Sequence, residues 1–190
     1  MRHKLLIASI AASAFATPAL AQDATGNVNI NGLVADRCLF TTPSEVINVG
    51  ELALPGSGAS AGRLDTSKLD GESRTLVGWC NGTAATMTVE ALALFNVDFT
   101  SPAPTGFDRR VDYTADALAN AVTATDSSTA ASPGAGSPVP VGLFTGDVVV
   151  TLSSSSSPTN GLLIAGTYQG QVIVTLSPNV SGGDSGPTQE

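Results

Sequence analysis

Histidine is nearly absent from this sequence. The 190 residues contain one, His3, which lies in an N-terminal stretch that we predict is removed. Ser–His–Asp and Cys–His catalysis and histidine metal sites are therefore excluded from the remaining chain. Sixteen Asp and Glu leave carboxylate-pair hydrolysis open in principle, but none sits in a motif that singles it out. We expect a protein that is not an enzyme and that has neither cofactor nor metal.

Basic and aromatic residues are also scarce. Eight Lys and Arg stand against sixteen Asp and Glu, and aromatic residues make up 5% of the chain. Loss of Arg2 and Lys4 with the N-terminal stretch would leave six basic residues and a net charge of −10. Nucleic acids and anionic membrane surfaces need basic patches, so both are excluded as partners. Asp65, Asp70 and Glu72 could bracket calcium, but their spacing fits no EF-hand loop and favours a solvated turn.

The first 21 residues have the pattern of an export signal. Arg2, His3 and Lys4 form a charged start, residues 5–15 are apolar, and Ala19-Leu20-Ala21 is a typical cleavage site. The apolar run is too short for a permanent membrane span. We therefore expect an exported protein whose mature chain starts at Gln22 and has no embedded segment.

Cysteine occurs twice, at Cys38 and Cys80. An even count behind an export signal points to a disulfide, which would stabilise the fold by about 4 kcal/mol in the chain-entropy model. Two buried thiols or half of a metal site are the alternatives, although two thiolates alone do not fill a zinc shell. We also expect Trp79 to be buried beside this pair.

Alternating apolar and polar residues favour strands throughout the mature chain. The clearest case is Gly166–Pro178, where Tyr168, Gly170, Val172, Val174 and Leu176 share one face and no partner strand follows. Many short strands joined by turns predict an all-β sandwich or barrel.

The segment Asn27–Val34 alternates as regularly as the last strand. Val28, Ile30, Gly32 and Val34 lie on one side, opposite Asn27, Asn29 and Asn31. It is either the first strand of its own domain or a strand that pairs elsewhere.

Other stretches give weaker expectations. Val46–Leu54 predicts one or two strands bent at Gly50, and Asn81-Gly82 is a strong hairpin signal. Ala115–Val122 is consistent with a helical turn or two, and Thr123–Val141 with a long exposed loop.

Four pieces in order resemble the pilins of archaic chaperone–usher (Csu-type) pili and the related spore-coat-U-like proteins. They are the alternating run before Cys38; Cys80-Asn81-Gly82-Thr83; Arg109-Arg110-Val111-Asp112-Tyr113; and the closing residues 165–176. The resemblance covers essentially the whole mature chain. The stretch Thr123–Val141 is long for this family, and the chain continues for a dozen residues after the last strand.

The resemblance implies an immunoglobulin-like antiparallel β-sandwich that lacks its final strand. It implies a subunit of a bacterial surface pilus or coat that passes through the periplasm to the cell surface. Its partners would be a periplasmic chaperone, an outer-membrane usher and other copies or related pilins. The missing strand would come from a neighbour, because an open sheet edge is a template for pairing.

This resemblance divides the chain into a signal peptide (1–21), a donor-type strand (22–36), a sandwich (37–178) and a disordered acidic tail (179–190). Val28, Ile30, Gly32 and Val34 would be donor residues, and Tyr168, Val172, Val174 and Leu176 would form the acceptor edge. The alternative is a self-contained exported binding module, for example for carbohydrate or surface adhesion. Such a module would need an exposed aromatic platform, for which few aromatic residues are available.

Overall fold

The computed structural model describes residues 23–178, and the predicted export signal and acidic tail lie outside them. Contacts divide the chain between Val34 and Ala35. We call residues 23–34 the N-terminal segment and residues 35–178 the sandwich, and we describe each by itself.

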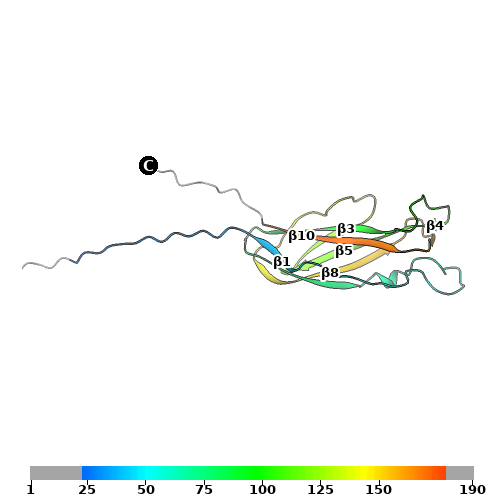
Figure 1. The fold of residues 1–190 in the computed structure, drawn as a ribbon, viewed down its shortest axis with the longest axis horizontal. Coiled ribbons are helices and arrows are strands. Elements are labelled where there is room, and N and C mark those ends of the chain that lie inside the picture. The colour runs from blue at the N-terminus through cyan, green and yellow to red at the C-terminus, as the bar shows by residue number, and fades with distance from the viewer. Residues whose placement is uncertain (1–22, 179–190) are drawn as a thin grey trace, which may run out of the picture. The chain divides into compact units, whose positions relative to one another are not determined.

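The sandwich is all-β and antiparallel in its main sheets, as the sequence predicted, with an immunoglobulin-like architecture (Figure 1). In one layer the neighbours run β1 (Cys38–Thr42), β2 (Ser73–Cys80), β8 (Phe144–Ser156), β5 (Arg110–Ala119) and β6 (Val122–Ser127). The other layer contains β10 (Tyr168–Ser177), β3 (Thr86–Asn96) and β7 (Val139–Pro140).

Strand β5 joins the two layers. Its first residues, Arg110 and Val111, pair with Phe95 and Leu94 of β3, and its later residues pair with β8 and β6. Among the remaining elements, β4 (Phe107–Asp108) pairs in parallel with β9 (Leu162–Leu163), and a 3-10 turn, η1, covers Thr66–Lys68. The described residues contain no helix that is long and apolar enough to cross a membrane.

The core lies between the layers and is built largely from small side chains. Met87 and Val89 of β3 are fully buried, as are Val148 of β8 and the alanines of β5. Ala115, Ala117 and Ala119 alternate inward at 0–1% exposure, so β5 packs closely against its neighbours.

This packing corrects the expectation of helical turns over Ala115–Val122. Alanine favours helix in isolation, but here its small size fits a tightly packed strand, and tertiary packing overrides propensity. Asn120 and Ala121 adopt positive φ angles of 48° and 61°, as a type I′ turn requires, and connect β5 to β6. The predicted loop Thr123–Val141 is therefore only partly a loop, since β6 and β7 occupy its two ends.

The prediction of a hairpin at Asn81-Gly82 is also wrong. Strand β2 pairs with β1 and β8, whereas β3 pairs with β10, β5 and β7. Residues 81–85 therefore connect different layers instead of joining two paired neighbours.

The predicted disulfide is confirmed, because Cys38 and Cys80 are bonded and stand opposite each other in the β1–β2 ladder. A disulfide is typical of proteins outside the reducing cytosol. Trp79 differs from expectation: it pairs with Leu39 on the outer face of this ladder and is half-buried instead of lying in the core.

Candidate functional site

A groove of about 1230 Å³ lies between β10 and residues 43–53 of the sandwich. Its floor is apolar and comes from both layers, with Leu76, Leu94 and Leu152 among the lining side chains. Leu76 and Leu94 are half-buried, in contrast to the fully buried Met87 and Val89 elsewhere in the core. The groove is therefore a place where the core is incompletely covered.

The first wall of the groove is β10, which is a terminal strand. It pairs with β3 on one side, and the strand order within the described residues gives it no partner on the other. Tyr168, Val172 and Val174 line the groove and are half-buried. Leu176 points the same way but lies beyond the groove, close to Gly78 of β2, where the layers approach each other. An unpaired edge beside exposed core residues can accept another strand.

The second wall, residues 43–53, includes most of Val46–Leu54, which was expected to form one or two strands and does not. Ile47, Val49 and Leu52 turn inward, and Ala53 makes a single bridge to Leu64. Among the described residues, the one hydrogen bond to the backbone of residues 43–51 comes from Arg74, whose Nε donates to the Val46 carbonyl at 2.8 Å. The pattern is that of a strand, but the partner that would complete a ladder is missing.

Two tyrosines, Tyr113 and Tyr168, line the groove. The Tyr113 hydroxyl lies 2.8 Å from the Leu92 carbonyl and 2.9 Å from that of Gln171, beside the β-bulge at Gly170. The Tyr168 hydroxyl lies 2.9 Å from the Ile164 carbonyl. Burial raises the pKa of both phenols, so both are neutral at ordinary pH. They act as packing groups with a satisfied polar end.

The N-terminal segment carries the predicted donor residues and has no assigned strand. Val28, Ile30 and Val34 are 88%, 92% and 80% exposed, and a Cβ added at Gly32 would meet nothing within 4 Å. Leu33, on the asparagine side, is 95% exposed as well. Asn27–Val34 is therefore not a strand of the structure, although its alternation is that of one.

The buried carboxylates have structural roles. Asp108 accepts hydrogen bonds from the Thr159 hydroxyl at 2.9 Å and the Gly161 amide at 2.7 Å, and so fixes the loop before β9. Asp126 accepts from the Ala91 amide at 2.7 Å where β3 runs past β6. Across residues 23–178, no three His, Cys, Asp or Glu side chains gather closely enough to hold a metal ion.

Sequence reasoning found the β10 wall but missed the other one. Alternation placed Tyr168, Val172 and Val174 on one face, yet it could not show that Val46–Leu54 would stand across a groove from them. No pattern in the sequence indicated that Tyr113 and Arg74 would lie at the groove.

Comparison of this chain with protein-family models, curated proteins and solved structures finds no match.

Proposed function

We propose that the protein is a structural subunit of a bacterial surface pilus or coat that assembles by strand donation between copies. Residues 27–34 of one copy fill the groove of the next. The observation that carries this proposal is a groove with an apolar floor and two walls, β10 and residues 43–53, which present unpaired backbone along the outer edge of β10 and along residues 43–51. Buried backbone groups need hydrogen-bond partners, and one inserted strand could satisfy both walls.

The donor residues suit such a groove chemically. Val28, Ile30 and Val34 share one parity, with Gly32 at the remaining position, as the inward residues of a strand do. Their burial would contribute about 5–8 kcal/mol in total before ladder hydrogen bonds are counted. Gly32, which has no side chain, would stand where the backbones of donor and groove come close. The asparagine face would point to solvent.

Export and assembly partners complete the proposal. The signal-like residues 1–21 and the disulfide fit transit through an oxidising periplasm. An open apolar groove needs cover before assembly, which the resemblance to Csu-type pilins assigns to a periplasmic chaperone. An outer-membrane usher would then exchange the chaperone strand for the next subunit at the cell surface.

The test is Ile30→Asp in cells that carry the native assembly partners. A carboxylate at an inward position would have to be buried without a partner, so we expect polymers to be lost while the subunit is still exported. Asn29→Asp is the matched control, since it adds the same charge on the outward face and should leave polymers intact. Polymers of normal length from Ile30→Asp would refute the donor role of this segment.

A further inference from the structure

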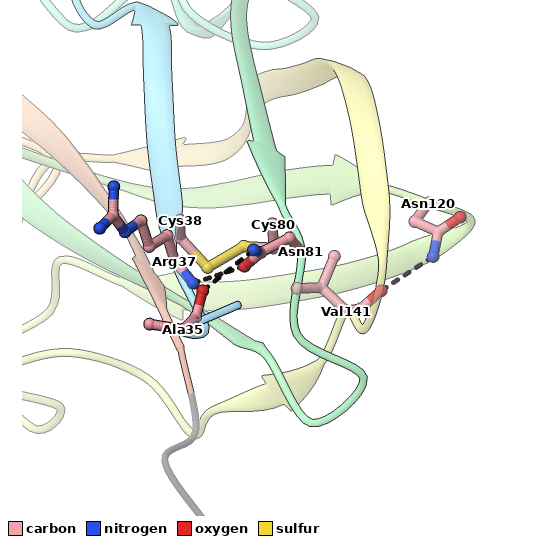
Figure 2. The surroundings of a disulfide bond; sticks show 7 residues. All are labelled: Ala35, Arg37, Cys38, Cys80, Asn81, Asn120 and Val141. Carbon is pink, nitrogen blue, oxygen red and sulfur yellow. Dashed lines mark hydrogen bonds between the residues drawn. A yellow bond between two sulfur atoms is a disulfide. The ribbon is translucent and has the colours of Figure 1, made fainter. Parts of the chain in front are cut away.

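Asn81 forms an anchor for the residues that follow the N-terminal segment. Its backbone amide donates to the Arg37 carbonyl at 3.0 Å. Its side-chain Oδ1 accepts from the Arg37 amide at 2.5 Å, and its Nδ2 donates to the Ala35 carbonyl at 3.1 Å. Figure 2 shows this amide facing Ala35 and Arg37 next to the disulfide. One residue thus makes three hydrogen bonds to residues 35–37.

These bonds extend the β1–β2 pairing beyond the end of both strands. The last paired residues are Cys38 and Cys80, and the side chain of Asn81 then offers one donor and one acceptor, as a strand backbone would. The next residue supports the arrangement, because a Cβ on Gly82 would lie 3.1 Å from the Asp36 carboxyl carbon. Gly82 therefore leaves room for Asp36 beside the anchor.

We expect this anchor to contribute little to the stability of the sandwich. Asn81 is exposed, residues 35–37 contribute no side chain to the core, and the disulfide already holds β1 to β2. What the anchor does determine is the position of the backbone at Ala35, directly after the N-terminal segment.

We infer that Asn81 is a positioning residue that fixes the origin of the donor strand at Val34. This inference rests on the proposed function, in which residues 27–34 enter the next copy. With residues 35–37 held, the link between successive sandwiches has almost no slack. Releasing them would add three residues, or about 10 Å of extended chain, to that link. A stiff fibre with a defined subunit spacing follows from the short link.

The first test uses the single subunit and does not depend on assembly. Amide hydrogen exchange at Arg37 is measured by NMR on the full chain. Asn81→Ala removes the acceptor of this amide, so we expect exchange at least tenfold faster. Asn120→Asp is the control: it breaks a similar bond, from Asn120 Nδ2 to the Val141 carbonyl (2.8 Å), at a site shown in the same view (Figure 2). In Asn120→Asp the Arg37 amide should exchange at the wild-type rate. Equal exchange in Asn81→Ala and wild type would refute the anchor.

The second test measures the stiffness of assembled fibres by electron microscopy. We expect Asn81→Ala to shorten the persistence length at least twofold at unchanged subunit stability, and Asn120→Asp to leave it unchanged. Equally stiff Asn81→Ala fibres would overturn the positioning role. If the wild type formed no fibres, the proposed function and the positioning role would both fall, whereas the exchange measurement would still decide whether Asn81 anchors residues 35–37.

Discussion

Gly32 offers the sharpest test of how the donor segment fits the groove. Nothing lies within 4 Å of a Cβ built on Gly32, and its backbone is outside the left-handed region, so Gly32→Val should leave the isolated subunit unchanged. In the assembled state the same side chain would face a groove lined by Tyr113 and Tyr168. The substitution therefore acts on assembly alone.

Whether Gly32→Val weakens or strengthens binding shows whether the groove has space for a side chain at this position. If the tyrosines leave no space at this position, overpacking costs about 1–3 kcal/mol, which weakens binding about 5- to 150-fold. If space is present, burying a valine side chain instead contributes about 1.5 kcal/mol or more and strengthens binding about tenfold. The close backbone approach that we propose at Gly32 leads us to expect weaker binding.

The assay titrates fluorescent peptides that cover residues 23–36 into the full chain carrying Ile30→Asp, whose own segment should be unable to donate. Anisotropy gives the dissociation constants of the unmodified peptide and of the Gly32→Val peptide. A Gly26→Val peptide is the control, because Gly26 is equally unhindered in the structure but lies outside the alternating residues 27–34. Equal or tighter binding of the Gly32→Val peptide would refute a close approach at this position.

Two further outcomes concern the sandwich itself. Cys80→Ser should lower the free energy of unfolding by about 2–5 kcal/mol, measured by urea denaturation, and reductant should then destabilise the wild type but not the variant. Tyr113→Phe should cost about 1 kcal/mol near neutral pH, because the Leu92 and Gln171 carbonyls lose their shared donor. Burial raises the pKa of Tyr113 above its ordinary value of 10.0, so its contribution to stability is present below about pH 10 and is lost as the pH rises further. Between pH 9 and 11 the free energy of unfolding should therefore fall less in Tyr113→Phe than in the wild type. An equal fall in both proteins would contradict this assignment.

The parts of the fold that sequence could predict are those where local pattern and long-range pairing agree. Residues 168–177 alternate and do form a strand beside β3, and two cysteines behind an export-like start do form a bond. Where local preference and packing disagree, prediction failed. The alanines of β5 favour helix locally, but their size is used to bring strands together, and only the structure shows the positive φ angles at Asn120 and Ala121 that reverse the chain.

The candidate site was half predictable for a different reason. Alternation indicates that a segment has one apolar face, but it does not say which strand lies beside it. Val46–Leu54 illustrates this limit: its apolar residues favoured one or two strands, and Ile47, Val49 and Leu52 do turn inward, but the expected ladder is absent because no described strand stands next to it. The same property that made the secondary-structure prediction wrong creates the second wall of the groove.

Three stretches therefore have apolar residues and strand-like backbone without a complete set of partners: residues 27–34, residues 46–52 and the outer edge of β10. A chain that left all three unmatched would expose apolar side chains and backbone groups at once, which is unfavourable in water and invites uncontrolled pairing. Inserting the first stretch between the other two would bury the apolar side chains of all three and pair their backbones in one contact. In the proposed assembly each copy would donate residues 27–34 and accept a strand in its groove, so head-to-tail pairing would leave a donor and a groove free at the two ends and would continue into a fibre. A single strand that pairs with both walls is therefore the strongest physical reason to expect strand donation, and this reason depends on both walls of the groove.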